Sequence, residues 1–434
     1  MGVRIILTAV LVALTVVSAR AVEVQQATSP AGTAFWLVEE PSIPIVSIQM
    51  SFKGGARLDP PDRPGLSRLT VGLLDDGAGD LDAVAFSKER DRIAARYGFG
   101  VDHDSLTVSA TMLKDEAQAS AALLGTVLAE PRFDPEAIER MRAQMLSGLA
   151  SDETDPGTIA GRTWYARAFP EHPYGRTTAG TPDAVRAITR AEIVATHARL
   201  LARARASVAV VGAVTVDEAG QLIDTILAGM PEGGPAAPIA AEPAPPPSGI
   251  EVVPLSVPQS VAVWGQTGLR RDDPDFFAAF VMNHILGGGG FSSRLMTEVR
   301  EKRGLAYSVY AYLSELDGAV LYIGRVQTAN DRIAESLDVV RAEWRRMAEE
   351  GVSQDELDKA KRYLTGAFPL RFDSNAKIAG FLVFAQEAGL GADYIDRRNG
   401  LIEAVSVEDI RRVAARLLAP DALSIVVVGE PAGL

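Results

Sequence analysis

The sequence predicts an α+β protein of two duplicated halves, each a mostly antiparallel sheet covered by helices. Similar helices begin at Ala187 and Ala404, and similar strands begin at Ser207 and Ser424, so both elements recur 217 residues apart. An offset shared by a helix and a strand indicates duplication of a domain. The apolar strand-like segments do not alternate regularly with single helices, which favours an α+β arrangement over repeated βαβ units.

A proline-rich segment separates the two halves. Residues 232–249 read EGGPAAPIAAEPAPPPSG and have neither helical nor alternating periodicity, as is typical of a semi-rigid linker. We therefore expect a first α+β domain at 22–231 and a second at 250–434, each of a common domain size.

Hydrophobic periodicity predicts the main elements in order. Strands are predicted at 43–52, 105–113, 207–212, 260–267, 319–327 and 424–429. Helices are predicted at 64–77, 134–153, 187–202, 353–368 and 404–419. Capping boxes are predicted at three helix starts: Thr189 with Glu192, Ser353 with Glu356 and, in a weaker form, Ser406 with Asp409.

Residues 1–21 have the pattern of a secretory signal peptide. Arg4 precedes a largely apolar run from Ile5 to Val17, and residues 19–21 fit a small-x-small cleavage site. The run is too short to span a bilayer comfortably, and no later segment approaches that length. We expect a mature chain without a membrane span that is periplasmic or secreted.

Composition excludes several classes of function. The 434 residues carry a net charge of −13, which argues against a nucleic-acid partner because such a partner needs a basic face. The chain has no cysteine, so disulfides, thiolate nucleophiles and Cys-based zinc sites are all excluded.

Two motifs, taken with the duplication, resemble a known family. Residues 285–312 read ILGGGGFSSRLMTEVREKRGLAYSVYAY, and HPYGRTTAGTP begins at His172. Together they strongly resemble the pitrilysin/insulinase family of zinc metallopeptidases, and the resemblance covers almost the whole mature chain. It implies a peptidase fold and a peptide substrate.

The zinc motif of that family is missing. In the family, a His-x-x-Glu-His helix supplies two zinc ligands one turn apart and a Glu that acts as general base. Aligned on the Gly-Leu-Ser of residues 65–67, the motif positions hold Arg68, Val71 and Gly72. The third family ligand is a Glu on a later helix near residues 143–150, where no Glu occurs. The resemblance therefore implies that this chain binds no zinc.

Arg300 and Tyr307 are the candidate substrate-binding residues. In the family, an Arg and a Tyr seven residues later lie in the half without zinc and reach toward the substrate near the metal. The run REKRGLAY has that spacing. Such a pair would donate hydrogen bonds to a peptide carbonyl or its oxyanion, and these are strongest in a closed, dry chamber. The alternative is a solvated arginine followed by a half-buried tyrosine.

The other candidate sites have simpler structural explanations. The four histidines are His103, His172, His197 and His284, and since none precedes His103, a shifted alignment cannot restore the zinc motif. Around His103, alternation on a strand places the neighbouring aspartates on the opposite face, which disfavours a metal site. Residues 287–295, GGGGFSSRL, could cradle a phosphate but lack the Gly-Lys-Ser/Thr pattern, so a tight chain reversal is the better explanation.

Three functions remain to be compared. The leading one is a non-zinc-binding subunit of a heteromeric periplasmic peptidase, inactive alone, which would supply Arg300 and Tyr307 to a homologous subunit that binds zinc. The alternative is a catalytically inert binding or assembly protein that retains the peptidase fold. An independent peptidase would require a metal site that the sequence does not contain.

Overall fold

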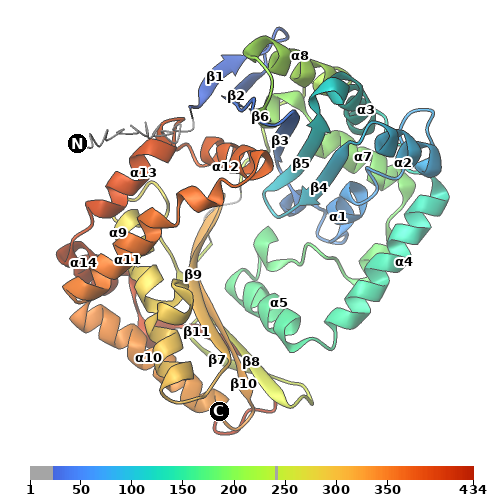
Figure 1. The fold of residues 1–434 in the computed structure, drawn as a ribbon. Coiled ribbons are helices and arrows are strands. Elements are labelled where there is room, and N and C mark those ends of the chain that lie inside the picture. Colours follow the sequence, from blue (N-terminus) through green and yellow to red (C-terminus); the bar gives the residue numbers. More distant parts are fainter. Residues whose placement is uncertain (1–22, 240–242) are drawn as a thin grey trace, which may run out of the picture.

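The structure is a computed structural model that describes residues 23–239 and 243–434, so the predicted signal peptide at 1–21 lies outside the described residues. It contains two sheets, each flanked by helices, in the two halves of the chain (Figure 1). Among the described residues, none of the helices has the length and apolar character that crossing a bilayer requires.

The first half contains a six-stranded sheet with the order β1-β2-β6-β3-β5-β4. Its strands are β1 Gln25–Thr28, β2 Ala34–Glu39, β3 Ile45–Lys53, β4 Arg96–Val101, β5 Ser105–Leu113 and β6 Ala206–Gly212. Its helices are α1 Leu66–Val71, α2 Ala83–Arg92, α3 Ala117–Ala129, α4 Pro135–Asp152, α5 Pro156–Ala168, α6 Pro182–Ala187, α7 Arg190–Leu200 and α8 Val216–Leu227.

The second half contains a five-stranded sheet with the order β7-β11-β8-β10-β9. Its strands are β7 Gly249–Pro254, β8 Gln259–Thr267, β9 Ser308–Leu316, β10 Ala319–Ala329 and β11 Ser424–Gly429. Its helices are α9 Phe276–Asn283, α10 Ile333–Glu350, α11 Gln354–Gly366, α12 Asn375–Glu387, α13 Tyr394–Glu403 and α14 Val407–Leu417.

The two sheets share one topology. In each, the last strand of the half pairs parallel with one neighbour, β6 with β2 and β11 with β7, and every other pairing is antiparallel. The first sheet differs by the additional edge strand β1. The predicted fold class of two duplicated α+β halves is confirmed.

Strand alternation gives each sheet two buried faces. On β3, Val46, Ile48 and Met50 face the main core of the first half, which contains α1, α3, α7 and α8. On β6, Val208 and Val210 also face this core, whereas Ala209 and Val211 face a smaller cluster on the other side of the sheet. Because both faces of β6 are covered, β6 is an apolar run in the sequence, whereas β3 alternates apolar residues with Ser47, Gln49 and Ser51.

Each half contributes a helix to the outer face of the other half's sheet. Helix α5 of the first half packs on β8 and β11, where Trp164 is fully buried and its indole Nε1 donates to the Ser424 carbonyl at 3.0 Å. Helix α12 of the second half packs on β3 and β6 through residues that include Ile378 and Leu382. The two helices occupy equivalent positions, after α4 and after α11, and this exchange joins the halves (Figure 1).

Several predicted elements have nearly the observed bounds. Strands β5 and β11 begin and end at the predicted residues, and all three predicted capping boxes form. The prediction for 64–77 was too long, since α1 ends at Val71 and the chain continues in tight i to i−3 turns to Asp76. The predicted linker is one residue too long, because Gly249 already belongs to β7.

Candidate functional site

Helix α1 carries the positions that correspond to the zinc motif. It starts after Gly65, whose φ of 91° is left-handed and whose missing Cβ allows Gly180 to approach. The buried Asp59 carboxylate accepts from the Ser67 backbone N–H, at 3.1 Å to each oxygen, and from its hydroxyl. Burial raises the pKa of Asp59, and the Ser67 hydrogen bonds oppose that rise. This contact holds the start of α1 in place.

The positions of the lost zinc motif line one cavity. Arg68 and Val71 of α1, together with Gly72 at its end, border a space of about 450 Å³ that α4 and the edge strand β4 also line. The same cavity is also lined by residues from the range 143–150, where the third ligand of the family would lie. These residues are Gln144, Met145, Gly148 and Leu149. The positions that the resemblance assigns to the zinc motif and to the third ligand therefore lie around one cavity, between α1 and α4.

The donor set of this cavity does not fit zinc. A guanidinium at Arg68 is cationic, while Val71 and Gly72 offer no side-chain donor, whereas zinc requires Cys, His or carboxylate ligands. Asp152 is the only residue lining the cavity that has a carboxylate. More broadly, residues 23–239 and 243–434 contain no group of three or more His, Asp or Glu side chains placed to hold a metal ion.

Arg300 and Tyr307 form an exposed cluster with Phe291 in the second half. The guanidinium carbon of Arg300 lies 4.6 Å from the ring centroid of Phe291 and 4.6 Å from that of Tyr307. The Phe291 side chain is 65% exposed and that of Tyr307 is 80% exposed. Within the described chain, the Arg300 guanidinium forms no hydrogen bond or ion pair, so the rings hold its faces while its N–H edge is free to donate.

Sequence reasoning missed Phe291, although it lies in the glycine-rich run that was singled out. The Ser292 and Ser293 hydroxyls donate to the carbonyls of Gly289 and Gly290, each at 2.9 Å. These local bonds reverse the chain, and Gly290 has a φ of 57°. Gly287 and Gly288 continue the helix after α9, and Gly290 begins a short turn that places Phe291 beside Arg300.

The structure does not join the two predicted sites. Among the described residues, no hydrogen bond, ion pair or ring contact links Arg300 or Tyr307 to the residues of α1. The Arg300 cluster precedes the edge strand β9 of the second sheet, while the α1 cavity borders the edge strand β4 of the first. Each site is thus incomplete as a hydrolytic centre within this chain.

The four histidines have structural roles. His103 lies in the turn between β4 and β5, not on a strand as predicted, and its Nε2 lies 3.1 Å from the Arg176 carbonyl. His172 precedes a short turn and accepts from the Tyr174 backbone N–H at 3.2 Å. His197 lies 3.0 Å from a helix carbonyl, and His284 stacks on an exposed tyrosine ring at 5.0 Å. Burial lowers the pKa of His172, His197 and His284.

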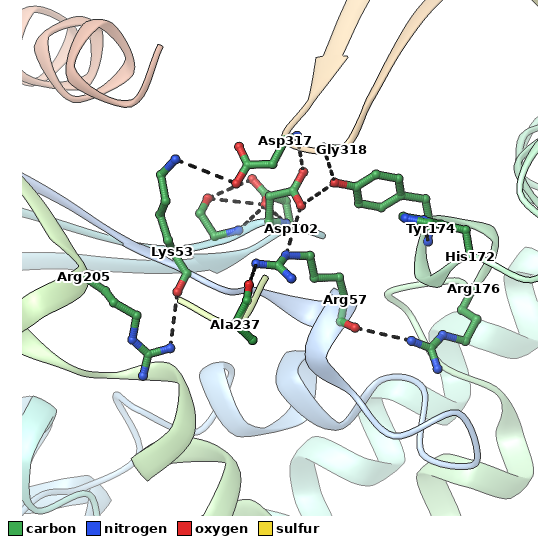
Figure 2. Close-up of polar contacts among 12 residues, drawn as sticks. Lys53, Arg57, Asp102, His172, Tyr174, Arg176, Arg205, Ala237, Asp317 and Gly318 are labelled. Carbon is green, nitrogen blue, oxygen red and sulfur yellow. Dashed lines mark hydrogen bonds and ion pairs between the residues drawn. The ribbon is translucent and has the colours of Figure 1, made fainter. Parts of the chain in front are cut away.

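A polar network that sequence reasoning missed joins the halves at the β9–β10 turn (Figure 2). The Asp104 carboxylate accepts from the Tyr174 hydroxyl at 2.7 Å and from the Asp317 backbone N–H at 3.0 Å. The Tyr174 hydroxyl in turn accepts from the Gly318 backbone N–H at 2.9 Å. Arg57 approaches Asp104 at 3.3 Å, so the buried carboxylate has a cationic partner. Tyr174 belongs to the HPYG motif, which was the available sequence signal.

This network borders a cavity of about 750 Å³ at the junction of the halves. The carboxylates of Asp104, Asp317 and Glu387 line it, together with Lys53, which lies 3.8 Å from Asp317. Burial raises the pKa of both Asp104 and Glu387. The arrangement fastens the halves together and places no activated nucleophile.

The fold defines a protein with metallopeptidase architecture, and the described residues of its candidate site offer no set of metal ligands. Sequence profiles agree with this class: the one described as insulinase (peptidase family M16) matches residues 35–182, and the one described as peptidase M16 inactive domain matches residues 187–364. The chain belongs to peptidase family M16.

The relatives of this chain include one named as a non-peptidase homologue and another named as an uncharacterised zinc protease. A non-peptidase homologue of Helicobacter pylori, YmxG, is 27% identical over 330 residues, which is 76% of each chain. An uncharacterised zinc protease of Streptomyces coelicolor is 25% identical over 404 residues, covering 91% of this chain and 87% of the relative. A solved peptidase M16 inactive domain of Pseudomonas fluorescens matches with a TM-score of 0.89 and 30% identity over 94% of this chain and 98% of that one.

Proposed function

We propose that this chain is the metal-free subunit of a heteromeric periplasmic peptidase. In this proposal, a zinc-bearing M16 homologue supplies the metal and the general base, and this chain supplies Arg300, Tyr307 and part of the chamber wall. The observation that carries the proposal is the contrast between the two sites. The α1 cavity offers no set of zinc ligands, whereas the Arg300 guanidinium lies 4.6 Å from each of two rings and forms no ion pair among the described residues.

The division of labour follows from the chemistry of the residues. A peptide carbonyl develops negative charge during hydrolysis, and donors placed at that oxygen stabilise the charge. The Arg300 guanidinium and the Tyr307 hydroxyl are such donors. The similarity to a non-peptidase homologue supports a role without independent hydrolysis.

The test reconstitutes the chain with a candidate zinc-bearing M16 homologue and measures peptide cleavage. Tyr307→Phe removes one hydroxyl from a side chain that is 80% exposed, so folding and assembly should be preserved. We expect the cleavage rate to fall by roughly 10²-fold, which is the scale for loss of one oxyanion donor. Arg300→Ala should cost at least as much and should weaken substrate binding as well.

The control is Tyr363→Phe, which removes a hydroxyl from another exposed tyrosine, 62% accessible on α11. Assembly is checked by gel filtration and the zinc content of the partner by elemental analysis, and neither should change. Intact complexes with wild-type turnover in both test variants would contradict the substrate role and would favour the inert binding or assembly protein.

A further inference from the structure

A second cavity in the second half is lined by three arginines and seven aromatic side chains. It has a volume of about 110 Å³ and lies between α9, α12, α13 and the short turn Pro369–Arg371. Its arginines are Arg271, Arg371 and Arg398. Arg271 and Phe384 also line the large cavity at the junction of the halves, so the two spaces adjoin.

Positive charge in this cavity exceeds the negative charge available to it. Arg398 is only 5% exposed, and its Nη1 donates to the Leu364 carbonyl and to Asn399 Oδ1, each at 3.2 Å, but it forms no ion pair within the described chain. Arg371 likewise has no ion pair among the described residues. Arg271 has one, with Glu315 at 3.5 Å. Buried arginines are rarely left without a carboxylate, because the desolvated charge is costly.

The three arginines line the same cavity, and their positive charges act on one another. Burial lowers the pKa of Arg398, and the positive charges of Arg371 and Arg271 lower it further. An anion bound among them would relieve that repulsion. Arg398 in particular is a buried guanidinium without an ion pair among the described residues, and such an anion would supply the missing acceptor.

The rings restrict the shape of that acceptor. The Arg398 guanidinium carbon lies 4.1 Å from the ring centroid of Phe368, and that of Arg271 lies 4.5 Å from Phe276 and 4.9 Å from Phe384. With their faces against rings, the guanidiniums present N–H groups at their edges, and a planar carboxylate fits such edges with two parallel hydrogen bonds.

We propose that this cavity binds a small organic carboxylate, with the carboxylate among the three arginines and the apolar part among the aromatic rings. A closed apolar cavity of about 150 Å³ in another protein accepts benzene. The space here is smaller, at about 110 Å³, so it suits a carboxylate with a short apolar part, and a single ring would extend through the open side. Arg371 and Phe384 are exposed and leave one side open. This site is separate from Arg300 and Tyr307 and is independent of the proposed peptidase partnership.

The experiment is calorimetric titration of the mature protein with benzoate as the probe. We expect one site per chain and an accompanying rise in melting temperature, since a ligand bound to the folded state stabilises it. Benzamide, the neutral planar analogue, should show no measurable binding. Inorganic phosphate, which has the charge and lacks the apolar part, should bind at least ten-fold more weakly than benzoate.

Variants locate the site. Arg371→Gln and Arg398→Gln should each weaken benzoate binding at least ten-fold. Arg397→Gln is the matched control, because Arg397 is the neighbour of Arg398 on α13 but pairs with Asp393 at 2.7 Å outside the cavity. The exposed Arg371 keeps the test valid if Arg398→Gln does not fold. No benzoate binding at millimolar concentration, equal binding of benzamide, or equal affinities in Arg371→Gln and Arg397→Gln would each overturn the proposal.

Discussion

Arg68, Val71 and Gly72 stand at the positions that the family resemblance assigns to the zinc motif. The cavity beside α1 has room for longer side chains: a Cβ at Gly148 would meet nothing within 4 Å, and a Cβ at Gly72 would lie 3.0 Å from the flexible end of Met141 and 3.2 Å from the Arg68 carbonyl oxygen. Ligand side chains would therefore fit here with small adjustments of Met141.

We accordingly predict that four substitutions create a zinc site: Arg68→His, Val71→Glu, Gly72→His and Gly148→Glu. The variant should retain one zinc ion per chain after dialysis against a weak chelator, because three protein ligands suffice for a catalytic-type site. The wild-type chain should retain none, and omission of Gly148→Glu should weaken retention. Elemental analysis measures each case; a folded four-fold variant without zinc would show that this cavity is not the former metal site.

The carboxyl of Glu387 predicts a dependence of stability on pH. Burial raises its pKa above the ordinary 4.5, although the Ser51 hydroxyl donates to it. A raised acid pKa means that the folded state holds the proton more tightly than the unfolded state, so stability is lost as the pH rises through the folded pKa. Glu387→Gln should therefore match the wild type near pH 4 and exceed its melting temperature increasingly at higher pH.

Glu356 provides the opposite case as a control. Burial alone would raise its pKa, but hydrogen bonds from Arg294 and Ser353 outweigh burial and lower the pKa to about 2. Its stabilising contribution is present above pH 4.5 and is lost as the pH falls toward 2. Glu356→Gln should thus destabilise at neutral pH. If both variants show the same pH trend in thermal unfolding, this electrostatic explanation is wrong.

At the scale of elements, the contact of α5 with the second sheet is closely packed. Gly265 of β8 lies under Trp164, and a Cβ at Gly265 would come 2.4 Å from the indole ring. Gly265→Ala should therefore destabilise the protein by about 1–3 kcal/mol, as overpacking of a core does. The measurement is the free energy of unfolding in urea.

Gly161→Ala is the comparison for Gly265→Ala, because Gly161 lies on α5, the helix that carries Trp164. A Cβ at Gly161 would meet nothing within 4 Å, so alanine should stabilise α5 by about 0.5–1 kcal/mol through its better helix propensity. Equal effects of the two alanines would show that α5 is not closely packed on β8.

Sequence patterns predicted the central elements better than the edges. Apolar runs predicted β6, β8, β10 and β11, because both faces of these strands are largely buried, and alternation of apolar with polar residues predicted β5. The edge strands β4 and β9 were missed, since glycines interrupt β4 and exposed Tyr310 and Tyr312 alternate on β9. The Asp317-Gly318 pair between two apolar stretches was a usable hairpin signal for β9.

The candidate sites show the same limit. Motif spacing predicted the α1 positions and the Arg300–Tyr307 pair, because local residues define them. The exchange of α5 and α12, the Asp104–Tyr174 network and the arginine-lined cavity depend on contacts between distant segments, for which a single sequence carries no periodic signal.

At the scale of the whole molecule, the exchange of helices predicts what cleavage of the linker does. Residues 232–235, 244–245 and 247–248 are exposed, while Arg57 donates to the Ala237 carbonyl at 3.1 Å, so a broad-specificity protease should cut first at either end of the linker. The two fragments should remain associated in gel filtration, because α5 and α12 each stay packed on the other half. Separation of the fragments without denaturant would contradict this view of the junction.

The position of β11 has a consequence for how the protein is made. This strand comprises residues 424–429 of 434, yet it lies between β7 and β8 and provides the carbonyl that Trp164 binds 260 residues earlier in the chain. At roughly 5–20 residues per second, α5 would emerge from the ribosome about 10–50 s before its partner strand. The apolar face of α5 therefore lacks its partner strand until β11 has been synthesised, and the second sheet cannot close between β7 and β8 before then.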